Sequence, residues 1–286
     1  MPDLEVGNGT LRAHAVLGKI SWAMRSEPGA VRDSNEDFSD AFVSTAPDDA
    51  WDRGPLFVVA DGMGGHAAGE VASKIAVETS IAAWTGGAPA APPQGVRTAI
   101  RSANGAVYDA STLPGHRGMG TTIVALTVAG REAIIGHVGD SRAYLVRGGE
   151  CTQLTADHSR VAEMVRMKIL TPEEAVAHPA RNQLTRSLGT DLAVQVDLTR
   201  TPVEQADTIV LCTDGIWDVV SRVDIAEAIA AMGGDRPSPF AAVDQLIEMA
   251  LKRGASDNVT ALTVTVTSAL PIPAAAGRRF FRRGRP

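Results

Sequence analysis

The sequence predicts an α+β fold built on antiparallel β-sheets. Short apolar runs that are typical of strands dominate both ends of the chain, and the helical stretches come in paired blocks rather than alternating one by one with strands. That arrangement disfavours a parallel, doubly wound sheet. The 286 residues suffice for one large domain or two small ones, and 44% hydrophobic with 21% charged residues is typical of a globular chain.

The first part of the chain is expected to contain a flexible end, a buried strand and a helical hairpin. Residues 1–13 lack strong periodicity and are expected to be flexible, whereas the apolar run 56–60 predicts a buried strand. Apolar residues then recur at helical intervals over 69–84, a connector rich in Pro, Gly and Ala spans 86–95, and a second helical pattern covers 96–110. We expect these two helices to pack antiparallel.

Strand-like runs are frequent in the second half of the chain. Three of them are separated only by short turns and predict a β-meander, at 121–128, 132–138 and 143–146. A further buried strand is expected at 208–212. Two helices and a closing strand are then predicted, at 224–232, 239–252 and 259–267.

Residues 151–190 are more polar and of mixed pattern, and predict a flap that is partly independent of the rest. A helix is expected to begin there at Thr171, which fits the N-cap position. Pro172 suits the first turn, and Glu174 completes a capping box with Thr171.

The composition excludes several classes of protein. Cys151 and Cys212 are far apart, lack a CxxC partner and are not followed by Arg six residues later, so a disulfide framework and the C-x5-R loop of cysteine phosphatases are excluded. A reduced, cytoplasmic protein is therefore expected. No signal peptide is visible, and no apolar run approaches the ~18 residues of a membrane helix.

The net charge of −6 is unevenly distributed along the chain. Five arginines lie in the last ten residues, so the remainder is more acidic still, and this disfavours nucleic acid as a partner because phosphates would be repelled. The tail, residues 269–286, is rich in Pro and Ala and then basic. It is expected to be either a disordered, solvated end or a weak contact for an anionic membrane or an acidic partner.

The positions of four aspartates carry the chemistry of the sequence. Asp61, Asp140 and Asp214 directly follow strongly apolar runs, and Asp257 shortly precedes one. One Asp-Gly alone is typical of a hairpin turn. Four carboxylates at one edge of a sandwich would repel one another, and hard divalent cations relieve that repulsion. Without an HExxH pair, the oxygen donors predict a binuclear Mg²⁺ or Mn²⁺ site and not a zinc site.

Residues 31–37, VRDSNED, add a second polar cluster. Its Arg32 is suited to bidentate capture of a phosphate, and Glu36 and Asp37 add two adjacent acids. A solvated charged loop is the alternative interpretation of this cluster.

Two other chemistries fit less well. Residues 139–143 come near the G-x-S-x-G nucleophile elbow, but they lack the final Gly and lead into a strand pattern, whereas an elbow must lead into a helix. The loop 62–65 precedes a helix but has no following Lys-Ser or Lys-Thr, so a P-loop is excluded. Its glycines fit a close approach of the backbone to a metal, with the Gly62 carbonyl as a ligand.

Six motifs in a fixed order resemble the bacterial, type 2C (PPM) class of metal-dependent serine/threonine protein phosphatases. They are VRDSNED, ADGMGGHAAGE, GMGTT, HVGDSRAYL, TDGIWD and SDNVT. The resemblance covers nearly the whole chain and implies a catalytic domain at 14–268, with 151–190 as the variable flap. It further implies a four-layer αββα sandwich, in which two antiparallel sheets are flanked by helix pairs.

The resemblance also implies the inner metal ligands. Asp61 would bridge two Mn²⁺ or Mg²⁺ ions, the carbonyl of Gly62 would bind one of them, and Asp214 and Asp257 would bind the other. Arg32 would bind the substrate phosphate and, with these aspartates, form the catalytic set.

Outer ligands follow from the same resemblance. Glu36 and Asp37 would act through metal-bound water. Asp140, together with Asp214 or Asp218, would form the third and weaker metal site of bacterial members. The role of Asn258 beside Asp257 is left open.

The chain departs from the eukaryotic pattern at one position. Eukaryotic members carry a histidine two residues after the bridging aspartate as a proposed general acid, and here that residue is Met63. His66 lies three residues further on, where a capping or packing role is the alternative. Either His66 or a metal-bound water is left to protonate the leaving oxygen.

The predicted reaction is direct hydrolysis of phosphoserine and phosphothreonine by a water that two metal ions activate, without a phospho-enzyme. The expected partners are phosphorylated proteins, including Ser/Thr kinases, and the expected state is a monomer. Three alternatives are kept: a partner-switching phosphatase acting on anti-sigma-factor antagonists, a non-catalytic pseudophosphatase that binds phosphoproteins, and a hydrolase of small phosphoesters. A pseudophosphatase would lack one of the metal aspartates, and all four are present.

Overall fold

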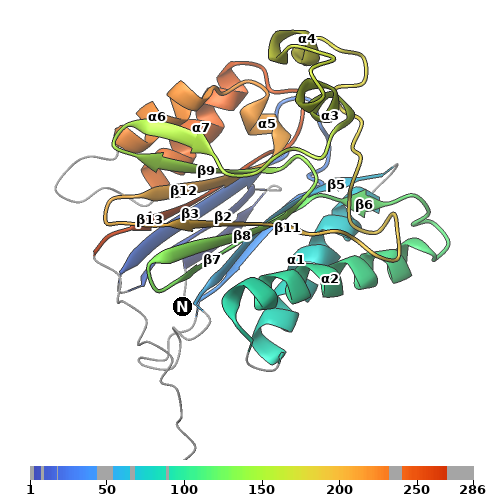
Figure 1. Ribbon diagram of the computed structural model, residues 1–286, viewed down its shortest axis with the longest axis horizontal. Helices are drawn as coiled ribbons and strands as arrows, with labels where there is room; N and C mark the ends of the chain where they lie inside the picture. Colours follow the sequence, from blue (N-terminus) through green and yellow to red (C-terminus); the bar gives the residue numbers. More distant parts are fainter. Residues whose placement is uncertain are drawn as a thin grey trace, which may run out of the picture.

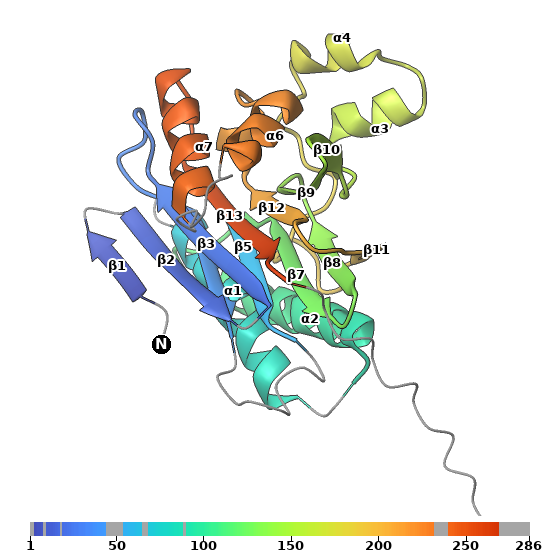
Figure 2. The same ribbon diagram turned by 90° about the vertical axis from the view of Figure 1, so that its left-hand side faces the viewer.

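Two antiparallel sheets pack face to face between layers of helices in the computed structural model (Figures 1 and 2), so the predicted αββα sandwich is confirmed. The structure describes residues 3–7, 10–17, 19–43, 54–64, 68–87, 90–231 and 240–268. The predicted tail at 269–286 lies outside these residues.

Seven strands of the described chain form one sheet, in the order β1-β2-β3-β13-β12-β9-β10. Their bounds are Asp3–Gly7, Thr10–Leu17, Ile20–Glu27, Val259–Val266, Thr208–Cys212, Arg142–Arg147 and Glu150–Gln153. All neighbours in this sheet run antiparallel. The strand nearest the C-terminus, β13, is therefore central and lies between β3 and β12.

The other sheet has six described strands, in the order β11-β8-β7-β5-β4 with β6 pairing to β5. Their bounds are Asp197–Pro202, Glu132–Val138, Ile123–Ala129, Leu56–Met63, Asp37–Phe42 and Gly120–Thr121. In the β4–β5 ladder Asp37 lies directly opposite Asp61. The register thus already brings two of the predicted site carboxylates together.

Helices cover the outer faces of both sheets. α1 (Ala68–Gly86) and α2 (Pro92–Ser111) pack on each other and on the six-stranded sheet, as the predicted hairpin requires (Figure 1). α6 (Arg222–Ala230) and α7 (Phe240–Lys252) cover the seven-stranded sheet, together with the short α5 (Asp214–Trp217). Because Pro92 and Pro93 open α2, this helix begins four residues before the predicted start.

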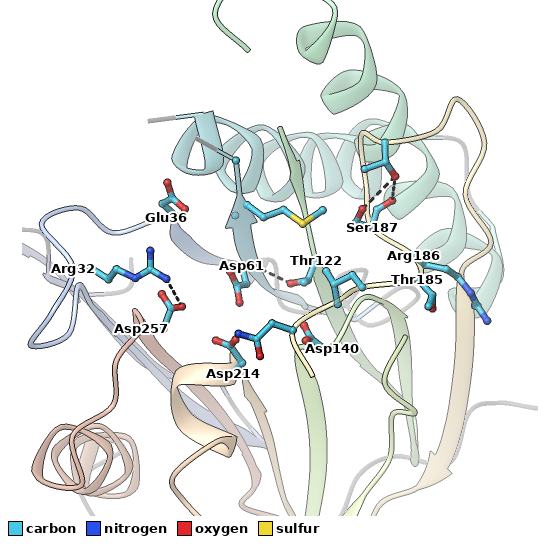
Figure 3. A pocket seen from close by; sticks show the side chains of 16 residues that line it. Arg32, Glu36, Asp61, Thr122, Asp140, Thr185, Arg186, Ser187, Asp214 and Asp257 are labelled. Atoms are coloured by element: carbon cyan, nitrogen blue, oxygen red, sulfur yellow. Dashed lines mark hydrogen bonds and ion pairs between the residues drawn. The ribbon is translucent and has the colours of Figure 1, made fainter. Parts of the chain in front are cut away.

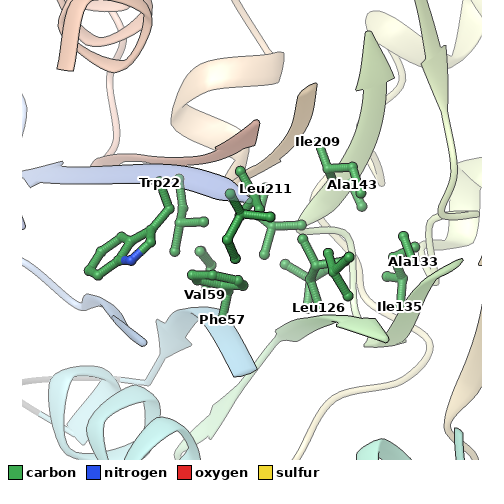
Figure 4. Close-up of a cluster of buried hydrophobic side chains, with 14 of the residues drawn as sticks. Trp22, Phe57, Val59, Leu126, Ala133, Ile135, Ala143, Ile209 and Leu211 are labelled. Carbon is green, nitrogen blue, oxygen red and sulfur yellow. The ribbon is translucent and has the colours of Figure 1, made fainter. Parts of the chain in front are cut away.

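The alternation of side chains along β5 explains how the layers are held. Phe57 and Val59 point into the core between the sheets, where Trp22 and Leu211 meet them from the other sheet (Figure 4). Leu56, Val58 and Ala60 point the opposite way and pack against α1 and α2. Asp61 shares the orientation of Phe57 and Val59. It is therefore the residue at which the inter-sheet core gives way to carboxylates.

The predicted meander of three strands is wrong. β8 pairs with β7 and β11 in one sheet, whereas β9 pairs with β10 and β12 in the other. The chain crosses between the sheets at residues 139–141, where Gly139 has a φ of 110°. Apolar periodicity reports that a strand is buried but not which sheet it joins, and this is why the prediction failed.

Two strands lie in the N-terminal part of the chain, where the sequence showed no strong periodicity. β1 and β2 form a hairpin there, and β2 pairs with β3 along its length. The sequence of β2 does have apolar residues at every second position, at 11, 13, 15 and 17. Alanine contributes little to an apolar pattern, so the strand was not recognised.

The flap contains α3 (Arg160–Arg166) and α4 (Pro172–Val176), which stand away from the sandwich in Figure 1. The predicted capping box is confirmed, because Thr171 Oγ1 accepts a hydrogen bond from Glu174 N and Glu174 Oε2 accepts one from Thr171 N. α4 buries none of its residues. In the part of the chain that the structure describes, no helix combines the length and apolar character needed to cross a membrane.

Candidate active site

Five acidic side chains of the described residues line one cavity of about 550 Å³: Glu36, Asp61, Asp140, Asp214 and Asp257. The cavity lies where the two sheets end, and the aspartates point into it from both of them (Figure 3). The structure thus brings together all four aspartates that the sequence placed at strand ends. Arg32 also lines this cavity.

The backbone of Asp61 is held by hydrogen bonds with Thr121 and Thr122. Its backbone N–H donates to Thr122 Oγ1 at 3.0 Å, and its carbonyl accepts from Thr122 N at 2.9 Å and from Thr121 Oγ1 at 2.8 Å. Burial raises the pKa of the Asp61 carboxyl well above its usual value, and the charge of Asp214 raises it further. Such a group favours a nearby positive charge.

Asp37 lies beneath Asp61 and is almost completely buried. Its Oδ2 accepts hydrogen bonds from Thr213 Oγ1 at 2.8 Å and from Thr260 Oγ1 at 2.6 Å. Burial nevertheless raises the pKa of Asp37 to about 7. Because Thr213 follows β12 and Thr260 lies in β13, this carboxyl group joins both sheets at the floor of the site.

Asp214 is the first residue of α5, directly after Thr213. Burial, together with charge repulsion from Asp257 and Asp218, raises the pKa of its carboxyl to about 6. The next residue must be glycine, because a Cβ atom at Gly215 would overlap with the carbonyl oxygen of Asn258. This close approach draws α5 against the start of β13 and brings Asp214 near Asp257.

Arg32 and Asp257 form an ion pair at the rim of the cavity, with Arg32 Nη2 2.7 Å from Asp257 Oδ2 (Figure 3). Both side chains are partly exposed, at 52% and 38%. The attraction of Asp257 raises the pKa of the Arg32 guanidinium, which stays charged. The predicted phosphate-binding group is therefore anchored on a predicted metal ligand.

Asn258 has a defined role that the sequence left open. Its Oδ1 accepts a hydrogen bond from Glu36 N at 2.8 Å. Its Nδ2 donates to the carbonyls of Pro28 at 2.9 Å and Ser34 at 2.8 Å. This one side chain therefore fixes the loop that carries Arg32 beside Asp257.

The glycines around Glu36 allow three backbone segments to meet. Gly62 N donates to Glu36 O at 3.0 Å, and a Cβ atom at Gly62 would overlap with the carbonyl oxygen of Gly69. A Cβ atom at Gly69 would lie 2.7 Å from Glu36 Oε2. Burial raises the pKa of Glu36. Gly62 is thus in close contact with the backbone of Gly69, and the approach of its carbonyl to a metal stays a prediction.

The three carboxylates predicted for a further metal also lie together. Asp140, Asp214 and Asp218 line a second, smaller cavity next to the first. Burial, together with the charge of Asp214, raises the pKa of Asp140 to about 7. Asp218 is partly exposed and pairs with Arg181 of the flap at 3.3 Å. His66, predicted as a candidate general acid, lies outside the described residues.

The donor set fits a hard divalent cation, since buried carboxylates that raise one another's pKa are relieved by positive charge. In the conformation described, no three Asp, Glu, His or Cys side chains of the described residues are close enough to ligate one ion together. The ligand roles of the individual aspartates therefore stay predictions.

The cavity has a second wall that sequence reasoning missed. Flap residues form it, among them Asn182, Thr185, Ser187 and Thr190. Small polar residues in an irregular segment give no periodic signal, so they could not be recognised in advance. Thr122, by contrast, lies in the motif GMGTT and could have been singled out.

The model of the family described as protein phosphatase 2C matches residues 29–259, well over half of the chain. The chain belongs to this family. As a member it is a protein phosphatase, and the predicted family is confirmed.

Relatives agree with this assignment over nearly the whole chain. The serine/threonine phosphatase stp of Listeria welshimeri is 35% identical over 245 residues, which cover 84% of this chain and 93% of that protein. The structure is similar to that of the serine/threonine phosphatase Stp1 from Staphylococcus aureus, with a TM-score of 0.78, 33% identity and coverage of 86% of this chain and 95% of that one. A further similar structure is the catalytic domain of the phosphatase PstP in complex with two manganese ions, with a TM-score of 0.73, 35% identity and coverage of 87% and 99%.

Proposed function

We propose that this protein removes phosphate from phosphoserine and phosphothreonine in proteins, with Mn²⁺ or Mg²⁺ as cofactor. The observation that carries the proposal is the meeting of Asp61, Asp214, Asp257 and Arg32 in one polar cavity at the end of the sandwich. Bound at these carboxylates, the ions would activate water and neutralise the charge of the phosphoryl oxygens. Family membership and the manganese-bound relative support the same choice of cofactor.

Arg32 supplies the positive charge that binds substrate. Its guanidinium lies at the open rim of the cavity and offers planar, bidentate donors that match a phosphate. Its partner Asp257 keeps it oriented toward the carboxylates. The loop from Pro28 to Glu36, which Asn258 holds in place, sets the distance between the phosphate and Asp61.

Hydrolysis without a phospho-enzyme is supported by the absence of an activated nucleophile among the described cavity residues. Cys212 is fully buried under α5–α7, and burial raises the pKa of its thiol; neither cysteine lines this cavity. Burial raises the pKa of Cys151 to about 11, which leaves it protonated. Thr122 Oγ1 is engaged by Ser141 Oγ at 2.7 Å.

The proposed substrates are phosphorylated proteins, among them Ser/Thr kinases whose action the enzyme opposes. The enzyme is proposed to act in the cytoplasm and as a monomer. The polar flap wall and the openness of the rim at Arg32 suit a polypeptide segment better than a small phosphoester. A weak contact of the basic tail with an anionic membrane or an acidic partner is part of the same proposal.

Hydrolysis of a phosphothreonine peptide, measured after chelation and again with added Mn²⁺, tests the function. We expect no activity in chelator and full recovery with Mn²⁺. Asp61→Asn and Asp214→Asn should abolish turnover while thermal unfolding remains cooperative, because each removes a charge that faces the cations. Activity that is insensitive to chelation, or near-normal turnover of either variant at saturating Mn²⁺, would contradict the proposal.

A further inference from the structure

Two buried histidines, His137 and His158, hold one peptide unit beside the active site. The backbone N–H of Gly139 donates to His158 Nδ1 at 3.1 Å. The carbonyl of Gly139 accepts from His137 Nε2 at 2.8 Å and from His158 N at 2.8 Å. The two rings stack with their centroids 4.4 Å apart. Both polar groups of Gly139 are thus fixed by side chains that the proposed reaction does not use.

The hydrogen bonds define the state of both rings. Because His158 Nδ1 accepts a bond, its proton lies on Nε2, which donates to Asp197 Oδ2 at 3.2 Å. His137 donates from Nε2, since a carbonyl can only accept. Burial lowers the pKa of His158, and that of His137 to about 4. Both rings are therefore neutral at neutral pH, and neither is placed as an acid or a base.

The peptide that they hold is the point where the chain leaves one sheet for the other. Gly139 directly follows β8 and has a φ of 110°, in a region that favours glycine, and a Cβ atom there would lie 2.6 Å from Thr122 Cβ. The next residue is Asp140, whose side chain lies in both cavities. Because glycine adopts such a conformation without strain, the hydrogen bonds from the two histidines select one orientation of this peptide. The orientation of Asp140 therefore depends on this clamp.

His158, itself a flap residue, also contacts the flap wall of the cavity. Its carbonyl accepts from Thr185 N at 2.8 Å, and Thr185 lines the cavity. Asp197, which accepts from the His158 ring, also accepts from Arg186 Nη1 at 2.8 Å. Figure 3 shows the Arg186 side chain turned away from the carboxylates, so its guanidinium anchors the flap wall from behind. His158 thus binds three segments, at residues 139, 185 and 197.

We propose that His158 is a positioning residue that couples the flap wall of the cavity to the Asp140 carboxylate. Its Nδ1 side sets Asp140 through Gly139, and its Nε2 side sets residues 184–187 through Asp197. The inference rests on the proposed function for its catalytic consequences. A histidine that merely fills the core would not divide its effects between two separate parts of the site.

Two conservative variants of His158 each remove one of the two hydrogen bonds of its ring, either the one at Nδ1 or the one at Nε2. In His158→Asn the amide oxygen replaces Nδ1 and can still accept from Gly139, but the donor to Asp197 is lost. In His158→Gln the amide nitrogen replaces Nε2 and can still donate to Asp197, but the acceptor for Gly139 is lost. His178→Gln serves as the control, because His178 is also a flap histidine and its Nδ1 contacts only a neighbouring backbone N–H at Ala180.

Amide hydrogen exchange of the metal-free protein is the first measurement. We expect faster exchange around residues 139–141 in His158→Gln and around 183–187 in His158→Asn, and no change at either place in the control. Asp197→Ala provides a second route to the flap effect. Because Asp197 is 42% exposed, this variant should fold, and it should loosen 183–187 alone.

Kinetics and metal titration complete the test. His158→Gln should weaken the weaker Mn²⁺ binding step, followed by calorimetry, and lower kcat by about 10-fold on both a phosphopeptide and p-nitrophenyl phosphate. His158→Asn and Asp197→Ala should raise KM for the phosphopeptide severalfold and leave p-nitrophenyl phosphate unaffected. Equal exchange patterns in the two His158 variants, or wild-type behaviour of Asp197→Ala, would overturn the inference. If the wild-type protein has no phosphatase activity, the proposed function fails, and the exchange and titration data still decide the role of His158.

Discussion

At the scale of single residues, the site is arranged as pairs of groups that restrain each other. Asp37 is opposite Asp61 in the ladder, Arg32 holds Asp257, and Asn258 holds the loop of Arg32. Each restraint joins segments that are far apart in the chain. The carboxylates therefore need few bonds of their own and keep their oxygens directed into the cavity.

Arg32→Ala should raise KM for a phosphopeptide by about tenfold, with a smaller effect on kcat, because the guanidinium binds the phosphate more than it acts on the leaving group. Initial rates over a range of peptide concentrations at saturating Mn²⁺ provide the measurement. Arg101→Ala, at an exposed position on α2, is the matched control and should behave as the wild type. A fall in kcat with unchanged KM would show that Arg32 does not bind the ground-state phosphate.

The sequence was enough to predict which residues form the site. It was not enough to predict the hydrogen bonds and ion pairs that hold them in place. Asp61, Asp214 and Asp257 could be selected because each stands next to a strongly apolar run. Asn258 has the same neighbourhood, yet its three bonds reach residues more than 200 positions away. His158 gave no signal at all, since its partners belong to a crossover that was predicted as a simple turn.

At the scale of elements, helices of the same local design differ in what they contribute. α4 and α6 both begin with a complete capping box, at Thr171 and at Ser221. α6 buries Ile225, Ala226, Ala228 and Ile229 against the seven-stranded sheet, whereas α4 buries none of its residues. Capping therefore supports the global fold in α6 and only the flap in α4.

Ser221→Ala should lower the free energy of unfolding by about 1 kcal/mol, the usual effect of losing an N-cap. Thr171→Ala should leave global unfolding unchanged within error and speed amide exchange in residues 171–177 alone. Urea denaturation of both variants, together with exchange mass spectrometry, makes the comparison. A global loss of similar size in Thr171→Ala would show that the flap unfolds together with the sandwich.

Element positions were predicted best where one face is buried and the run is long. The strand 208–212 agrees with β12, and the capping signal at Thr171 marks the start of α4. The assignment of β9 to the wrong sheet has a physical reason, because β8 and β9 are equally apolar and a three-residue crossover resembles a turn. β2 was missed because alanines form half of its alternating apolar residues.

At the scale of the whole molecule, the burial of the carboxylates and their mutual repulsion make stability depend on pH and metal. The pKa of Asp214 is raised to about 6 and those of Asp37 and Asp140 to about 7, so the metal-free folded protein keeps protons that the unfolded chain has released. Stability from these groups is full below about pH 4 and is lost as the pH rises to about 7. The lowered pKa values of His137 and His158 act in the opposite sense over part of this range.

The increase in melting temperature on adding Mn²⁺ reports the contribution of the carboxylates to the pH dependence separately from that of the histidines. We expect this gain to be larger at pH 7.5 than at pH 5, because the cation replaces protons that are already lost at the higher pH. With Mn²⁺ at about 100 times its Kd, the stabilisation should be roughly 2.7 kcal/mol, which corresponds to roughly 5–10 °C for a domain of this size. Differential scanning calorimetry at both pH values, with Mg²⁺ as a second cation and K⁺ as control, is the measurement. An equal gain at the two pH values would contradict this origin of the effect.

The central place of β13 has a consequence for synthesis on the ribosome. Residues 20–27 must wait for residues 259–266 before their sheet can close, and Asp257 enters the site with the same strand. Contacts of such long range form slowly, and until they form, two unpaired edges stay open to other nascent chains. Phosphatase activity should accordingly be withheld until residue 266 has been synthesised, so that a chain stalled before that point cannot dephosphorylate anything.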